Sequence, residues 1–172
     1  MNIVLIGYRG TGKSVVGELL AQKLNRETIS MDAEIVKKAG VSIPEFVEQN
    51  GWPKFRDLET EVARELAERD NIIVDCGGGI IERPENIPAL RSNGIIFWLQ
   101  ASVAMIVSRI ADSTERPALT EGKTFTEEVA EVLDRRSPLY SGAAQHTVNT
   151  DDMTPEQVAD SILAICNQVT GL

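Results

Sequence analysis

The chain has 172 residues, of which 42% are hydrophobic and 25% are charged, which excludes disordered, collagen-like and coiled-coil classes. Its 17 lysines and arginines against 26 aspartates and glutamates give a net charge of −9, which argues against the positive field that attracts nucleic acid or anionic lipid. This length predicts a single domain over residues 1–172.

The apolar segments and the cysteines predict an intracellular protein. The apolar run within residues 1–6 is interrupted by Gly7 and is too short for the apolar region of a signal peptide. The apolar run at residues 94–99 is too short to cross a bilayer. Cys76 and Cys166 lie far apart and do not suggest the disulfide framework of a small secreted protein. We therefore expect a cytoplasmic monomer with reduced thiols that acts on small molecules and binds neither nucleic acid nor membranes.

Short apolar strands and amphipathic helices are predicted to alternate along the chain. Residues 3–6 form an aliphatic run without polar alternation, which is typical of a parallel strand covered on both faces. The expected strands are residues 3–6, 27–30, 72–75, 95–99 and about 147–148, and the expected helices are residues 13–24, 32–39, 52–69, 84–91, 102–110, 125–136 and 155–169, with a further helix start at residues 42–45.

This order predicts an α/β fold with a mostly parallel central sheet of about five strands flanked by helices, with ligands at the carboxyl ends of the strands. Asp32 is the expected N-cap of its helix, and Ser137-Pro138 is expected to break the helix that begins at Phe125. The polar segment at residues 111–124 has no periodic apolar face, so we expect a lid there.

Residues 7–14 match the phosphate-binding pattern G-x-x-x-x-G-K-S between the first strand and the first helix. The glycines let this P-loop fold around an anion, and the helix N-terminus adds positive potential. Lys13 is expected to reach the terminal phosphates and Ser14 to bind magnesium. A glycine turn without a nucleotide is the alternative. The expected nucleotide contacts are Gly10, Thr11, Gly12, Lys13, Ser14 and Val15.

Asp75 ends a buried strand, where a Walker B aspartate lies close to magnesium in proteins with this loop. A turn or capping role is the alternative for an aspartate at a strand end. Guanine recognition through Asn-Lys-x-Asp is not supported, because the most similar stretch, residues 149–152, lacks the lysine. ATP is therefore the expected nucleotide.

Phosphoryl transfer also needs cations that hold the charge of the reacting groups. Each arginine taken alone also fits a solvated surface position, so the prediction of a phosphoryl-transfer site depends on several arginines together. The candidates, which stand at the ends of elements or in loops, are Arg56, Arg116, Arg135 and Arg136.

Five further motifs follow one another along the chain. They are Asp32 at the end of the second strand, Phe55-Arg56-Asp57-Leu58-Glu59 (similar to F-R-x-x-E), Gly77-Gly78-Gly79, Arg116-Pro117-Ala118-Leu119 (similar to the R-P-L lid) and Arg135-Arg136-Ser137-Pro138-Leu139-Tyr140 (similar to R-x-P-L-Y). With the P-loop they cover essentially the whole chain, which thus resembles the shikimate kinase family. The resemblance implies a P-loop fold like that of nucleoside monophosphate kinases. It also implies transfer of the γ-phosphoryl group of ATP, with Mg²⁺, to the 3-hydroxyl of shikimate in aromatic amino-acid biosynthesis.

The resemblance further implies roles for individual residues. Arg56 and Arg136 would hold the carboxylate of shikimate through fork-shaped bonds, with Glu59 bracing Arg56. Asp32 would orient the attacking hydroxyl or accept its proton. The substrate-binding helices are expected at about residues 32–69. The implied shikimate site also includes residues after these helices and consists of Asp32, Arg56, Gly78, Gly79 and Arg136.

On the nucleotide side the resemblance implies that Lys13 and Arg116 act on the transferred phosphate, so that Lys13, Asp32 and Arg116 form the catalytic set. Arg109 and Pro155 match positions that enclose adenine in the family. Closure of the lid that carries Arg116 would exclude water from the reaction.

One position departs from the family pattern. Shikimate kinases usually have Asp-x-Asp at the end of the second strand, and the first aspartate helps to organise magnesium, whereas this chain has Ser30 there. The family commonly has a small residue where this chain has Asp75. Our hypothesis is that Asp75 supplies the missing carboxylate beside Ser14, so that Ser14 and Asp75 form the metal site. A loss of magnesium support is the alternative.

Two other functions stay open from the sequence: a gluconate-type or nucleotide kinase of the same fold, and a catalytically silent ATP-binding module. Other notable residues are expected to be structural. Cys76 and Cys166 fit buried thiols, and His146 fits a surface or hydrogen-bonding position. Trp52 is expected to pack beside the substrate pocket.

Overall fold

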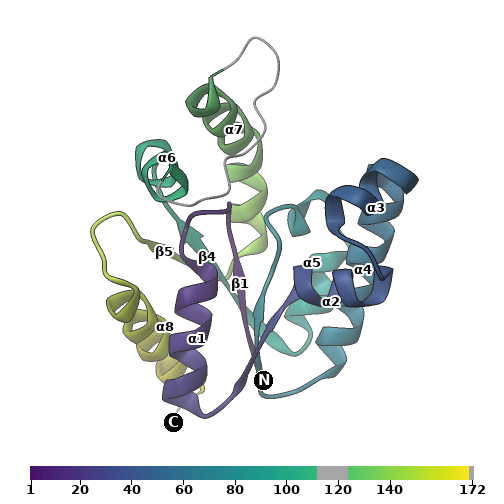
Figure 1. Cartoon of the computed structure of the whole chain (residues 1–172). Helices are drawn as coiled ribbons and strands as arrows, with labels where there is room; N and C mark the ends of the chain where they lie inside the picture. Colours follow the sequence, from purple (N-terminus) through teal and green to yellow (C-terminus); the bar gives the residue numbers. More distant parts are fainter. Residues whose placement is uncertain (112–123, 171–172) are drawn as a thin grey trace.

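The structure of the chain is a computed structural model that describes residues 1–111 and 124–170 (Figure 1). The lid expected at residues 111–124, including Arg116, lies outside the described residues apart from its two end positions.

Five strands form one parallel sheet in the order β2-β3-β1-β4-β5, which confirms the expected fold class. All residues of the central strand β1 are buried, because helices cover both faces of the sheet. The chain builds the sheet on one side of β1 and then on the other, an arrangement in which ligands bind at the carboxyl ends of the strands. The bounds are Asn2–Ile6 for β1, Glu27–Ser30 for β2, Ile72–Asp75 for β3, Gly94–Gln100 for β4 and His146–Asn149 for β5.

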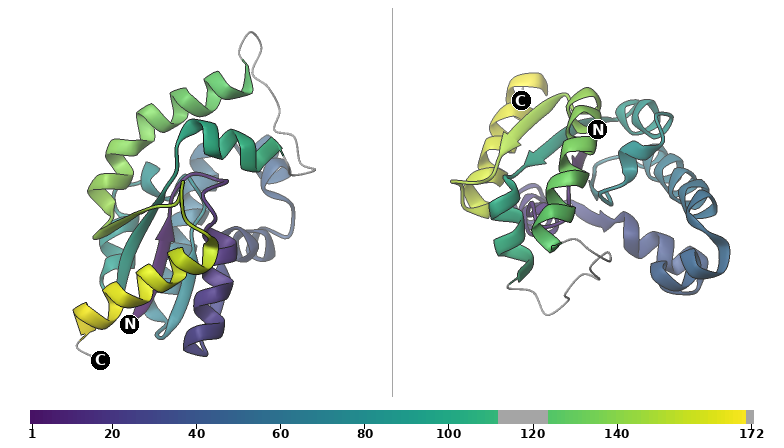
Figure 2. Two further views of the ribbon diagram at one scale, coloured as in Figure 1. Left: turned by 90° about the vertical axis from the view of Figure 1, so that its left-hand side faces the viewer. Right: turned by 90° about the horizontal axis from the view of Figure 1, so that it is seen from above.

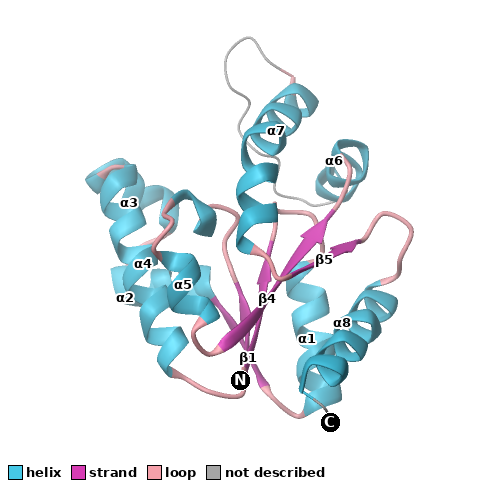
Figure 3. Ribbon diagram, turned by 180° about the vertical axis from the view of Figure 1, so that it is seen from behind, coloured by secondary structure: helices cyan, strands magenta, loops and turns pink. Residues whose placement is uncertain are grey.

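Helices cover the sheet on both sides (Figures 2 and 3). Ile3 and Leu5 of β1 pack with α1 and α8, whereas Val4 and Ile6 point to the opposite face and pack with α2, α4 and α5. No helix of the described residues is long and apolar enough to span a membrane. The bounds are Lys13–Leu24 for α1, Met31–Ala39 for α2, Ile43–Asn50 for α3, Trp52–Glu68 for α4, Asn86–Arg91 for α5, Val103–Ala111 for α6, Phe125–Ala143 for α7 and Pro155–Thr170 for α8, with a 3₁₀ helix, η1, at Ile80–Glu82.

The helix break expected at Ser137-Pro138 is wrong. Helix α7 continues through Pro138 to Ala143. Proline removes one helical hydrogen bond, but Tyr140 and Ala143 beyond it are buried, and this packing holds the last turns in place. The site motif that contains Arg136 and Tyr140 therefore lies on one rigid helix.

The N-cap expected at Asp32 is also wrong. Helix α2 begins at Met31, and the Ser30 side chain accepts a hydrogen bond from the backbone N–H of Ala33. Ser30 has an extended backbone (φ −80°, ψ 119°), as an N-cap residue should. Asp32 consequently lies inside the first turn, where its carboxylate is not used as a cap.

Replacing Ser30 with alanine should lower the free energy of unfolding by about 1 kcal/mol, because α2 loses its only side-chain cap. Ser30→Asn is the control, since asparagine caps a helix about as well as serine. Urea unfolding of both variants measures the difference. Equal stability of Ser30→Ala and the wild type would contradict the capping role.

Candidate active site

The P-loop joins β1 to α1 and holds an unusual backbone. Gly7, Gly10 and Gly12 have φ values of 144°, 78° and 92°, which residues with a side chain rarely adopt. A Cβ at Gly7 would also lie 2.5 Å from the carbonyl oxygen of Leu99. No side chain caps the N-terminus of α1, so its first N–H groups are available to an anion.

Lys13 is held across this loop. Its Nζ donates to the carbonyl oxygens of Gly7 at 2.9 Å and Tyr8 at 3.1 Å. Burial lowers the pKa of Lys13, while the nearby Asp75, Cys76 and Asp32 favour its charged form. The ammonium group thus stands beside a cavity of about 320 Å³ that the P-loop lines together with Asp32 and Asp75.

Ser14 and Asp75 both line this cavity and are hydrogen-bonded to each other. The Ser14 hydroxyl donates to Oδ2 of Asp75 at 2.6 Å, and Asp75 is 9% exposed. The P-loop and the end of β3 are therefore joined by a hydroxyl and a carboxylate, which are the types of oxygen ligand that magnesium prefers.

A second cavity of about 340 Å³ adjoins the first and is lined by aromatic, acidic and basic side chains. The two cavities share Arg9, Asp32, Gly77 and Gly78, so a molecule in each would meet at Asp32. We name them the phosphate-side and the acid-side cavity. The acid-side cavity is lined by Tyr8, Arg9, Asp32, Ile43, Trp52, Phe55, Arg56, Glu59, Gly77, Gly78, Gly79, Val132 and Arg136.

Two arginines of the acid-side cavity are each held by a carboxylate. Arg56 Nη1 donates to Glu59 Oε2 at 2.7 Å, and its guanidinium lies over the rings of Trp52 and Phe55 at 5.4 Å and 5.2 Å. Burial raises the pKa of Glu59 although Arg56 opposes that shift. Arg136 Nε donates to Glu82 Oε1 at 2.9 Å.

Gly77-Gly78-Gly79 follows β3 directly and gives these functional side chains their room. A Cβ would lie 2.8 Å from Asp32 Oδ1 at Gly77, 3.5 Å from Arg136 Nη1 at Gly78 and 2.2 Å from Arg56 Nη1 at Gly79. None of the three has a positive φ, so space rather than backbone conformation requires glycine here. The Tyr140 hydroxyl donates to the Gly78 carbonyl at 2.5 Å and fixes this loop to α7.

Asp32 lies where the cavities meet. Burial raises its pKa, and the neighbouring carboxylate of Asp75 raises it further, while Lys13 and Arg56 act in the opposite direction. A carboxylate in this position can accept a hydrogen bond, or a proton, from a hydroxyl group bound in the acid-side cavity.

A third cavity of about 230 Å³, mostly apolar, lies on the other side of the P-loop, and both Arg109 and Pro155 line it with Val15. Arg109 donates to the Gly10 carbonyl at 3.2 Å and to the hydroxyl and carbonyl of Thr150 at 3.0 Å and 2.9 Å. The guanidinium plane is therefore fixed next to a small apolar space beside the phosphate loop.

Comparison with known proteins supports one family. The shikimate kinase family model matches residues 9–167. The chain belongs to the shikimate kinase family. The shikimate kinase of Caldicellulosiruptor bescii is 38% identical over 164 residues, covering 95% of this chain and 94% of the relative. Shikimate kinase 2 of Enterobacter sp. strain 638 is 41% identical over 164 residues, with 94% and 92% covered.

Solved shikimate kinases also share the fold. The enzyme from Acinetobacter baumannii in complex with shikimate superposes with a TM-score of 0.89 and 33% identity, covering 98% of this chain and 93% of that one. The enzyme from Aquifex aeolicus has a TM-score of 0.81 and 30% identity, with 99% and 98% covered.

The remaining sequence predictions can be placed in this shikimate kinase fold. Trp52 lines the acid-side cavity as expected and is 56% exposed. Cys76 and Cys166 are buried, and burial raises the pKa of both thiols, which agrees with structural roles. His146 stacks on Phe97 with the ring centroids 5.3 Å apart. Arg135 is 58% exposed and does not line the cavities.

Sequence reasoning missed Arg9 and Glu82. Arg9 lines both the phosphate-side and the acid-side cavity and lies against the Phe125 ring at 5.9 Å. It occupies a variable position of the P-loop pattern, so the pattern carries no signal for it. Glu82 lies on η1, an element that the sequence pattern did not predict.

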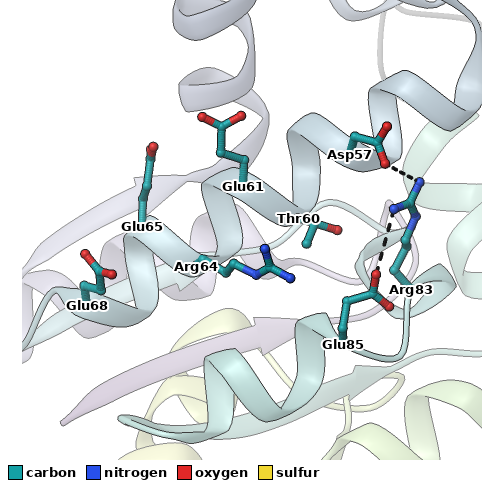
Figure 4. A pocket seen from close by; sticks show the side chains of 8 residues that line it. All are labelled: Asp57, Thr60, Glu61, Arg64, Glu65, Glu68, Arg83 and Glu85. Atoms are coloured by element: carbon teal, nitrogen blue, oxygen red, sulfur yellow. Dashed lines mark ion pairs between the residues drawn. The ribbon is translucent and has the colours of Figure 1, made fainter.

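The larger cavity of about 420 Å³ in Figure 4 is separate from these sites. It lies along α4 and is lined by charged side chains, among which Arg83 pairs with Asp57 at 2.6 Å and with Glu85 at 3.8 Å. No residue of the predicted site lines it.

Replacing Gly79 with alanine should lower the free energy of unfolding by about 1–3 kcal/mol. The new methyl group would force the Arg56 guanidinium away from Glu59, whose buried carboxylate would lose its partner. Gly142→Ala in α7 is the control, because its Cβ would meet nothing within 4 Å and alanine favours a helix. Urea unfolding compares the two, and an unchanged stability of Gly79→Ala would contradict the packing argument.

Proposed function

We propose that this chain transfers the γ-phosphoryl group of ATP to the 3-hydroxyl of shikimate. As a member of the shikimate kinase family it is an ATP-dependent kinase that acts on a shikimate hydroxyl. The observation that carries the finer proposal is the meeting of a P-loop cavity and a cavity with two arginines at one carboxylate, Asp32.

The acid-side cavity suits a small hydroxylated acid. Arg56 and Arg136 would bind the carboxylate of shikimate, since each guanidinium can present paired N–H donors to it. Gly78 and Gly79 would let the ring lie close to the backbone. Asp32 would orient the 3-hydroxyl toward the phosphate-side cavity and accept its proton as the phosphoryl group is transferred.

The nucleotide would bind along the P-loop. The N–H groups from Gly10 to Val15 would surround the phosphates, and Lys13 would move from the loop carbonyls to the terminal phosphates. Arg109 and Pro155 would enclose adenine in the small apolar cavity. The role of Arg116 stays a prediction, because this residue lies outside the described part of the chain.

The residues around Ser14 fit a magnesium ion. Its hydroxyl and the Asp75 carboxylate supply oxygen ligands, and the described residues hold no group of three acidic, histidine or cysteine side chains that would bind a cation without the nucleotide. Ser30 and Asp75 are register partners on β2 and β3, so Asp75 stands one strand away from the position where the family usually has its carboxylate. When bound, the ion would neutralise charge on the phosphates.

The same features disfavour the other functions. A silent ATP-binding module has no need for a carboxylate between two cavities, and the two arginines and three glycines of the acid-side cavity suit a small hydroxylated acid better than a second nucleotide. We further propose that the enzyme acts in the cytoplasm as a monomer, without nucleic acid or membrane, which agrees with its net charge of −9.

An assay of ADP release with shikimate, gluconate and nucleoside monophosphates as acceptors tests the function. We expect turnover with shikimate alone, and phosphorus NMR should place the new phosphate on the 3-hydroxyl. Turnover with another acceptor only, or with none, would refute the proposal.

Asp75→Asn should weaken the magnesium-dependent binding of ADP by at least about tenfold, because the amide lacks the negative charge that supports the cation. Ser30→Ala is the matched control and should leave this dependence unchanged. Calorimetric titration of ADP at several magnesium concentrations measures both variants without turnover. An unchanged dependence in Asp75→Asn, with a changed one in Ser30→Ala, would contradict the assignment.

A further inference from the structure

Glu82 joins the segment after the glycine loop to helix α7 through three hydrogen bonds. Its Oε1 accepts from Arg136 Nε at 2.9 Å and from Arg135 Nη2 at 3.0 Å, and its Oε2 accepts from Arg135 Nη1 at 3.1 Å. Partial burial alone would raise the pKa of Glu82, but the hydrogen bonds and charges of both arginines hold it below its ordinary value. Glu82 is therefore a carboxylate shared between two neighbouring guanidinium groups.

The atoms used in this contact determine which way Arg136 faces. Glu82 occupies Nε, on one edge of the guanidinium, while Nη1 lies beside Gly78 in the acid-side cavity. Arg56 is also held by one carboxylate, with Glu59 bound to Nη1, but Glu59 itself lines the cavity. Each carboxylate-binding arginine is thus held by one acidic residue.

We propose that Glu82 is a positioning residue that fixes Arg136 for the carboxylate of the acid substrate. The inference rests on the proposed function and adds to it a residue that does not itself line the acid-side cavity. Glu82 acts through Arg136, since its hydrogen bonds go to the two arginines and not into the cavity.

Charge and shape both require a carboxylate at this position. Arg135 and Arg136 are adjacent like charges, and a shared anion between them offsets their repulsion. A glutamine has one acceptor oxygen, so its amide would turn N–H donors toward one of the guanidinium groups. Aspartate is one methylene shorter and cannot reach both arginines from the same backbone position.

The pair contributes little to global stability, because Glu82 and Arg136 keep 21% and 16% of their side-chain surface exposed and water screens the interaction. Its effect is instead on the orientation of Arg136. Misplacing a substrate-binding group by about 1 Å is enough to cost up to 100-fold in activity. A defect in Glu82 variants should therefore appear in binding of the acid rather than in unfolding.

Glu82→Gln should raise KM for shikimate about tenfold, with kcat and KM for ATP within about twofold of the wild type. Glu85→Gln is the matched control, because Glu85 is also a glutamate paired with an arginine, but that arginine, Arg83, does not line the acid-side cavity. Shikimate titration followed by tryptophan fluorescence, without ATP, should show the same loss of affinity for Glu82→Gln only.

A neutral carboxamide analogue of shikimate separates positioning from a structural role. Because the analogue lacks the carboxylate that Arg136 binds, Glu82→Gln should leave its KM unchanged. Equal losses with the acid and the amide, or shikimate binding by Glu82→Gln equal to that of Glu85→Gln, would overturn the inference. Wild-type protein that neither binds nor phosphorylates shikimate would instead refute the proposed function itself.

Discussion

The three consecutive glycines that follow β3 set the geometry of the whole site, because they have no side chains. Gly77, Gly78 and Gly79 face Asp32, Arg136 and Arg56 in turn, and a Cβ at the first or third position would overlap with the facing group. The three functional side chains come from α2, α7 and α4, which are far apart in the sequence. They converge because each can approach the backbone of the glycine segment closely. Tyr140 fixes this segment by donating a hydrogen bond to the Gly78 carbonyl.

Charge pairing explains how an acidic protein can build a site for two anionic substrates. Three cations at the phosphate-side and acid-side cavities have nearby carboxylates: Arg56 has Glu59, Arg136 has Glu82, and Lys13 has Asp75 and Asp32. These carboxylates stand behind or beside the cations and orient them. The positive charge is therefore local and directed, while the molecule as a whole remains negative.

The sequence predicted what depends on local patterns, including the five strands, the P-loop and the two arginines, Arg56 and Arg136, that line the acid-side cavity. It failed where tertiary packing overrides a local preference. Pro138 would end a helix in isolation, but burial of Tyr140 keeps α7 continuous. Ser30 and Asp32 are both good N-caps, and only the backbone geometry selects Ser30. Glu82 had no motif, because its importance comes from a contact across 54 residues.

The register of Ser30 with Asp75 would explain how the proposed magnesium chemistry can persist although the family motif is incomplete. In a parallel sheet, residues in register on neighbouring strands lie at the same level, about 4.8 Å apart. A carboxylate exchanged between such partners stays at the carboxyl edge of the sheet and still faces the P-loop. The Ser14 hydroxyl, already bonded to Asp75, supports this reading. Ser30 caps α2, the helix that carries Asp32, and in our proposal its register partner Asp75 would supply the charge.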